Sequence, residues 1–100
     1  MALISLEEAK GYLRVDTADE DAMIGILLSS ATRLCADVAR LTDEQLSEME
    51  TDETSAARET MKMAVLYALG YLFEHREDAD HHDLTLTLRS LLFALREGVV

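Results

Sequence analysis

The sequence predicts an all-α protein, a small bundle of about four helices of which two are long and two shorter. Two observations support this prediction. The 100 residues include no proline and only four glycines, which suits long helices joined by short connections. Apolar residues also recur at spacings of three and four in the second and fourth predicted segments, the period of an amphipathic helix. A chain of this length is expected to form one domain over residues 1–100.

The first helix is predicted over residues 5–13. Ser5 and Glu8 have the spacing of a capping box, in which each side chain accepts a hydrogen bond from the other's backbone N–H. Leu6, Ala9 and Leu13 would then lie on one side of this helix.

The second helix is predicted over residues 18–40, with Thr17 as its N-cap and Glu20 as the capping partner. Acidic residues fill the first turn, where the helix dipole favours negative charge. Arg33 and Arg40 come late, where cations suit the helix end.

Residues 42–55 are predicted to form an acidic loop between the two long helices, with a short helical turn at 43–49 as an alternative. Loops of this length are often functional or mobile. The simpler explanation for the charge is a solvated surface. The carboxylates of this segment are Asp43, Glu44, Glu48, Glu50, Asp52 and Glu53.

The third helix, predicted over residues 55–77, contains the least polar stretch of the chain. Between Met61 and Phe73 the only charge is Lys62. This stretch is shorter than the roughly 20 residues that cross a bilayer, and a helix that is apolar all round is normally buried in protein. One small domain has little material with which to cover it. We therefore expect the third helix to pack on the second and also to reach a neighbouring subunit.

The fourth helix is predicted over residues 83–96. Residues 84–88 alternate between leucine and threonine, which is also a strand pattern. Helix is preferred because the leucines continue at helical spacing to Leu95 and no nearby segment offers a strand partner.

The net charge of −11 excludes several classes of partner. Proteins that grip nucleic acid place Lys and Arg at phosphates, and anionic membranes attract basic segments. Neither fits this chain, although a protein that lets DNA pass without holding it remains compatible. The single cysteine, Cys35, allows no intrachain disulfide and is expected to be a small buried apolar residue. The N-terminus lacks a signal-peptide pattern, so a reducing cytoplasm is the expected compartment of synthesis.

No constellation predicts catalysis, a cofactor or a metal. The four glycines are scattered and form no phosphate-binding loop. Residues 75–83 hold all three histidines with several carboxylates, but without the spacing of a helical ligand pair such as H-x-x-x-H. This segment is expected to be a polar loop between helices. A metal-dependent hydrolase built on it is the weakest of the alternatives.

Four segments give the chain a resemblance to a known family. They are Ile4-Ser5-Leu6-Glu7-Glu8-Ala9-Lys10 with Tyr12-Leu13-Arg14-Val15-Asp16; Glu20-Asp21 with Ile24, Leu27-Leu28 and Ala31; Ala68-Leu69-Gly70-Tyr71-Leu72-Phe73-Glu74-His75-Arg76-Glu77; and Leu91-Leu92 through Arg96. In this order they resemble the head–tail connector (adaptor, or head-completion) family of HK97-like tailed bacteriophages, also labelled putative DNA-packaging proteins. His75 stands where that family usually has Asn, and Ala94-Leu95 replaces its usual proline or aromatic residue.

The resemblance implies a small helical virion protein without enzymatic activity. About a dozen copies would form a ring beneath the portal. The ring would join the DNA-filled head to a neck, stopper or tail-completion protein, and the genome would pass through its centre without specific binding. Such a protein would occupy the neck of the virion after assembly in the host cytoplasm, with no membrane partner.

Two sets of residues are the candidate sites under this interpretation. The acidic 42–55 segment is expected to face the channel. The subunit or portal interface is expected to include Tyr67, Gly70, Tyr71, Phe73, Arg76 and Arg96. The alternative function is an acidic helical binding module or DNA-mimic regulator, supported by the net charge alone.

Overall fold

The computed structural model describes residues 3–52, 56–75 and 82–96, except for the side chains of Ala94 and Arg96. Every regular element in these ranges is helical, which confirms the predicted all-α class. The elements are α1 (Leu6–Leu13), α2 (Asp21–Ala39), α3 (Asp43–Thr51), α4 (Ala56–Glu74), α5 (His82–Leu91) and α6 (Phe93–Arg96).

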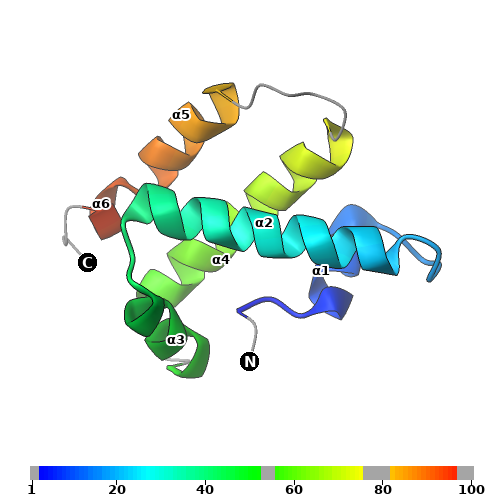
Figure 1. The fold of residues 1–100 in the computed structure, drawn as a ribbon, viewed down its shortest axis with the longest axis horizontal. Coiled ribbons are helices and arrows are strands. Elements are labelled where there is room, and N and C mark those ends of the chain that lie inside the picture. The colour runs from blue at the N-terminus through cyan, green and yellow to red at the C-terminus, as the bar shows by residue number, and fades with distance from the viewer. Residues whose placement is uncertain (1–2, 53–55, 76–81, 97–100) are drawn as a thin grey trace.

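The two long helices, α2 and α4, form the centre of the molecule. Figure 1 shows α2 crossing in front of α4, with α1 beside the N-terminal half of α2, α3 at the lower left, α5 at the top and α6 at the left, near the C-terminal end of α2. Small residues allow the two helices to approach closely, and larger apolar side chains close the core around them. Fully buried positions on these helices are Ile24, Ala31, Cys35, Ala36, Met61, Ala64, Val65, Ala68 and Leu69.

The predicted capping box of α1 is confirmed. Glu8 N donates to Ser5 Oγ at 3.1 Å, and Ser5 N donates to Glu8 Oε1 at 3.0 Å. The helix ends at Leu13 and is followed by Arg14 in a left-handed conformation (φ 60°). The Arg14 N–H donates to the carbonyl of Gly11, and the Val15 N–H donates to that of Lys10. Arg14 is the C-cap that turns the chain toward α2.

The predicted start of α2 was wrong. The helix begins at Asp21, and its N-cap, Glu20, makes no capping hydrogen bond through its side chain. The Asp21 N–H instead donates to the carbonyl of Ala18 in a turn, and the Asp21 carboxylate lies 2.7 Å from Lys10 Nζ of α1. A contact between helices therefore accompanies the start of α2, where the sequence pattern suggested a Thr17–Glu20 capping box.

The prediction of a loop at 42–55 was wrong for most of its length, because residues Asp43–Thr51 form α3. The alternative of a short helical turn at 43–49 is the one found, extended by two residues. Thr42 and Gln45 make a second capping box, with bonds of 3.1 Å and 2.8 Å, so the local sequence does encode a helix start. Three half-buried residues, Leu41, Leu46 and Met49, attach this segment to the core. No residue of α3 is fully buried.

Residues 84–88 are helical, which confirms the preference for a helix over a strand. Leu84, Leu88 and Leu92 are buried on the inner side of α5 and the turn that follows it. A turn at Leu92 separates the short α6 from α5. With α3 included, the described chain has more than the four helices predicted.

Helix α2 is long and apolar enough to meet a simple length and composition test for a membrane span, with a mean hydropathy of 1.4. Core helices of globular proteins pass the same test. Ile24, Ala31 and Cys35 of α2 are fully buried, while 28% of the tested 18-residue window is buried as a whole. A single helix of this kind is weak evidence for a membrane span.

Candidate functional site

A groove lined by aromatic residues lies between the C-terminal half of α4 and the end of α1. We call it the aromatic groove. Its volume is about 600 Å³. Four of its residues, Tyr67, Gly70, Tyr71 and Phe73, were predicted as interface residues from the sequence. The complete lining is Tyr12, Leu13, Arg14, Tyr67, Gly70, Tyr71, Phe73 and Glu74.

Gly70 explains why α1 can approach α4 at this point. A Cβ atom at Gly70 would lie 3.2 Å from Cε2 of Tyr12, closer than an ordinary van der Waals contact. The glycine therefore gives room to the Tyr12 ring, which is still 50% exposed, as Tyr67 is 42% exposed. Tyr12 is the main groove residue that sequence reasoning did not select, because its contact joins segments far apart in the chain.

One end of the groove is ordered by Tyr71 and His75. Their rings stack with centroids 4.2 Å apart and planes inclined by 18°. His75 Nδ1 also lies 2.9 Å from the carbonyl oxygen of Tyr71. The same carbonyl oxygen accepts from the backbone N–H of His75 at 2.9 Å, so both the ring and the backbone of His75 lie against Tyr71 at the end of α4.

Ion pairs hold α1 in the position that forms the groove. Lys62 of α4 lies 3.4 Å from Glu8 Oε2, and Lys10 pairs with Asp21 of α2. The hydrogen bond from the Ser5 N–H, followed by the interaction with Lys62, holds the pKa of Glu8 below its ordinary range. A second hollow of about 400 Å³ adjoins the groove, shares Tyr12 and Tyr67 with it, and adds Met63 and Leu66 to the apolar surface.

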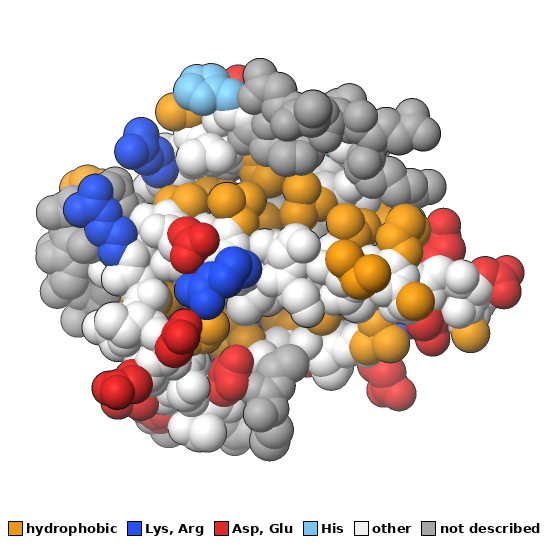
Figure 2. All heavy atoms as spheres, viewed as in Figure 1, with side chains coloured by type: hydrophobic (Ala, Val, Ile, Leu, Met, Phe, Trp, Pro, Cys, Tyr) orange, Lys and Arg blue, Asp and Glu red, His pale blue; other side chains and the backbone are white. Residues whose placement is uncertain are grey.

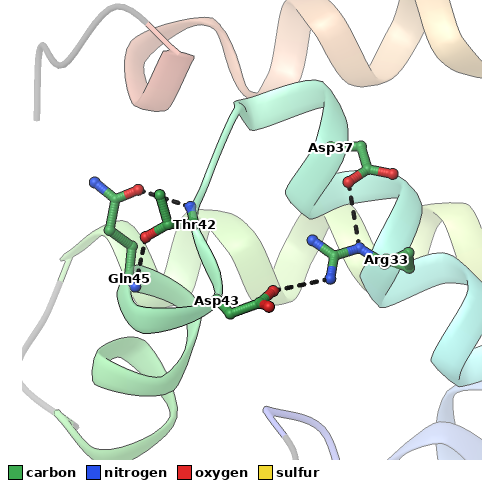
Figure 3. A network of polar contacts seen from close by, with 5 residues as sticks. All are labelled: Arg33, Asp37, Thr42, Asp43 and Gln45. Carbon is green, nitrogen blue, oxygen red and sulfur yellow. Dashed lines mark hydrogen bonds and ion pairs between the residues drawn. The ribbon is translucent and has the colours of Figure 1, made fainter.

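The acidic helix α3 lies on a different side of the bundle from this groove. Figure 3 shows how its N-terminus is fastened: Arg33 of α2 lies 3.2 Å from a carboxylate oxygen of Asp37 and 3.2 Å from one of Asp43. The hydrogen bond to Asp43, with the charge of Asp37, raises the pKa of Arg33. Figure 2 shows carboxylates over α3 and around the connection from α1 to α2.

The predicted acidic residues that the structure describes all lie on α3 or at its C-cap. Asp43, Glu44, Glu48 and Asp52 are exposed, and Glu50 is half-buried. Glu53 lies outside the described residues. Helix α3 contains no basic residue of its own, so it presents a surface of one sign apart from the contact with Arg33.

A third surface is the outer side of α5 and α6. We call it the α5–α6 ridge and define it by Asp83, Leu86, Arg89 and Phe93. Leu86 is 47% exposed and Phe93 is 58% exposed, while Asp83 and Arg89 are also exposed. The ridge lies opposite the buried leucines that attach α5 to the core.

Two other sequence features have structural outcomes. Cys35 is buried in the core, and this burial raises the pKa of its thiol to about 12, which keeps it protonated and unreactive. Within the described residues no group of three or more His, Cys, Asp or Glu side chains is placed to hold a metal. Most of the histidine-containing segment, including Arg76 and His81, lies outside those residues, and so does the side chain of Arg96.

Comparison with known proteins gives the family. A family model described as "Phage gp6-like head-tail connector protein" matches residues 3–97. The chain belongs to this family. The searches of curated proteins and of solved structures found no match to this chain.

Membership makes this connector a structural virion component that associates with phage head and tail parts, and the family is not a class of enzymes. The family assignment also gives a context for the groove. Residues 12–16 and 68–77 are two of the segments on which the resemblance rested. Both contribute to the aromatic groove, although the predicted interface role of its residues remains a prediction.

Proposed function

We propose that this connector is a ring subunit that forms beneath the portal and joins the DNA-filled head to the neck or tail. The observation that supports the proposal is the aromatic groove, where Tyr12 and Tyr67 remain about half exposed next to a well-packed core. Aromatic residues are enriched at protein interfaces because they bury a large area at low cost in conformational entropy.

A closed ring suits this arrangement. Its subunits meet head to tail, so each copy uses two different surfaces. The groove supplies one such surface. Its α4 side carries four residues that the sequence predicted for the interface: Tyr67, Gly70, Tyr71 and Phe73. Arg76 follows α4 and completes the proposed contact with a neighbour or with the portal, together with Arg96.

The acidic helix α3 is proposed to face the channel. Its exposed carboxylates, with Glu53 after it, would repel the phosphates of the passing genome. Repulsion prevents the ring from holding DNA and allows the genome to move in either direction. The same helix has no buried residue, so its sequence is under little constraint from the core.

The proposed partners are other copies of the chain, about a dozen in all, the portal protein, and a neck, stopper or tail-completion protein. DNA would pass through without specific binding, and no membrane is involved. The subunit would be made in the host cytoplasm and would end in the neck of the virion.

Native mass spectrometry tests the proposal, first on the chain alone over a range of concentrations and then after mixing with the portal protein of the same phage. The expected result is a closed oligomer, alone or on the portal. Electron microscopy of the mixture should show it as a ring on the portal axis. A chain that remains monomeric in both samples, or that instead captures a DNA-binding enzyme from the host, contradicts the proposal and favours the DNA-mimic alternative.

A further inference from the structure

The exposed large apolar side chains of the described residues fall into two groups. One lies on α1 and α4 and comprises Leu6, Tyr12, Met63 and Tyr67. The other lies on the α5–α6 ridge and comprises Leu86 and Phe93. Ile26 of α2 belongs to neither group. A head-to-tail contact requires two different surfaces on each copy, and the described part of the chain presents two such apolar patches.

The two patches also differ in shape. The groove side is concave, with a volume of about 600 Å³, within the range of roughly 300–1,000 Å³ typical of sites that enclose a small ligand. The ridge side is a helix surface from which Leu86 and Phe93 extend into solvent. An aromatic side chain of the ridge is therefore a suitable occupant for the groove.

The charged residues of the groove and of the ridge are also complementary. The groove carries Arg14 and Glu74, and the ridge carries Asp83 and Arg89. Within the described residues, Arg14 and Arg89 make no ion pair, although the chain has 20 carboxylates and only nine Lys and Arg residues. Each surface thus presents an unpaired cation together with a carboxylate, as two complementary surfaces would.

We propose that the α5–α6 ridge of one copy docks into the aromatic groove of a second copy, with Phe93 in the hollow, Arg89 at Glu74 and Asp83 at Arg14. This inference rests on the proposed ring function and names the two surfaces that meet in it. Burial of the aromatic side chain supplies most of the affinity, since central aromatic residues dominate interface energetics. The two charge pairs at the rim fix the orientation of the copies more than their affinity.

A matched pair of variants tests the apolar part. Phe93→Asp removes the ridge aromatic, and Ile26→Asp makes the same change at a residue that is 67% exposed and outside both patches. Analytical ultracentrifugation over a concentration series measures self-association, and circular dichroism checks that both variants fold. Phe93→Asp is expected to weaken association at least about tenfold, whereas Ile26→Asp should change it by less than about twofold.

A charge-reversal experiment tests the polar part. In Arg89→Glu both the ridge and the groove present an acidic group at the proposed contact, and in Glu74→Arg both present a basic one. Each variant alone should therefore associate about tenfold more weakly than the natural chain. An equimolar mixture should recover association, because the ridge of each variant then meets a groove of opposite charge, giving oligomers in which the two variants alternate. Native mass spectrometry reads this alternation directly from the masses.

The outcomes separate the docking contact from the function on which it rests. The ridge-to-groove contact is wrong, and the ring proposal stands, if the natural chain associates but Phe93→Asp associates equally well. The same holds if the mixture of Arg89→Glu with Glu74→Arg does not regain association. If the natural chain forms no oligomer at any concentration or on the portal, both are overturned. Loss in Phe93→Asp with recovery in the mixed charge variants supports the contact.

Discussion

Helices α4 and α3 follow one another in the chain but are held in the structure by different forces. Six residues of α4 are buried, including Val65 and Leu69, and the helix contacts α1, α2, α3 and α5. Helix α3 has no buried residue and depends on a capping box, an ion pair to Arg33 and a few half-buried side chains. The fold therefore depends on α4, while α3 is an attached element whose surface is available for another purpose.

This difference fits the separate functions proposed for the two helices. Helix α4 packs most of its circumference against the core and leaves Tyr67 exposed on one side, which is the side proposed for assembly. Helix α3 contributes charge with little contribution to the core. A chain of 100 residues can in this way carry a proposed interaction surface beside α4 and an acidic surface on α3.

The largest expected effect tests the claim that α4 holds the core. Leu69→Ala should lower the free energy of unfolding by about 2–5 kcal/mol, because it removes a fully buried side chain and leaves a cavity. Met63→Ala, at an exposed position of the same helix, should change it by less than about 0.5 kcal/mol. Urea unfolding followed by circular dichroism measures both. Equal effects would mean that α4 does not carry the core.

The next prediction tests whether α3 unfolds independently of α4. Thr42→Ala removes the N-cap oxygen that accepts from Gln45 N, and should cost about 1 kcal/mol. Hydrogen exchange should accelerate in residues 43–51 and stay unchanged in α4. Thr42→Ser keeps the hydroxyl and serves as the control. Faster exchange throughout α4 in Thr42→Ala would show that the two helices unfold as one unit.

A smaller effect distinguishes the assembly side of α4 from its core side. Gly70→Ala gains up to about 1 kcal/mol of helix propensity but places a methyl group 3.2 Å from Tyr12. Because Tyr12 is half exposed and can shift, we expect a stability gain of less than about 1 kcal/mol together with weaker self-association. Gly25→Ala on α2 meets no heavy atom within 4 Å and should raise stability without affecting association. Unchanged association in Gly70→Ala would remove Tyr12 from the contact.

The contrast between α4 and α3 also shows what the sequence could predict. The run from Met61 to Phe73 identifies the central helix because its apolar character is continuous. The run does not show which side is buried, since Met63 and Tyr67 within it are exposed. The capping box at Ser5 was found because it is local. The same local pattern at Thr42 and Gln45 also encodes a helix start, but the density of carboxylates in 42–55 favoured a loop.

Other features depended on contacts between distant segments. The Thr17–Glu20 pattern predicted the wrong start for α2, where the structure shows the contact of Lys10 with Asp21. The α4 residues of the groove were among the predicted interface residues because they lie on one apolar helix. Tyr12 was not, because it reaches the groove through a tertiary contact. The ridge was not predicted at all, because Leu86 and Phe93 resemble core residues until the direction of α5 is known.

The smallest expected effect concerns the attachment of α1, which shapes the groove against α4. The pKa of Glu8 is lowered in the folded protein, so its contribution to stability is present above its ordinary pKa of 4.5 and is lost as the pH falls through the lower folded value. Glu8→Gln keeps an acceptor oxygen for the Ser5 N–H but removes the charge that faces Lys62. Because Glu8 is about half exposed, the loss at neutral pH should be only a few tenths of a kcal/mol.

The lowered pKa of Glu8 also predicts how the effect of Glu8→Gln on stability changes with pH. The stability difference between the natural chain and Glu8→Gln should be constant at neutral pH and should shrink below about pH 4.5, as protonation makes the natural side chain neutral too. Glu7→Gln, which changes a neighbouring exposed carboxylate without an ion pair to Lys62, is the matched control. A double-mutant cycle with Lys62→Met isolates the pair. A difference that grows on acidification would mean that Glu8 is not stabilised as a carboxylate, and that α1 is held on α4 by the Tyr12–Gly70 packing alone.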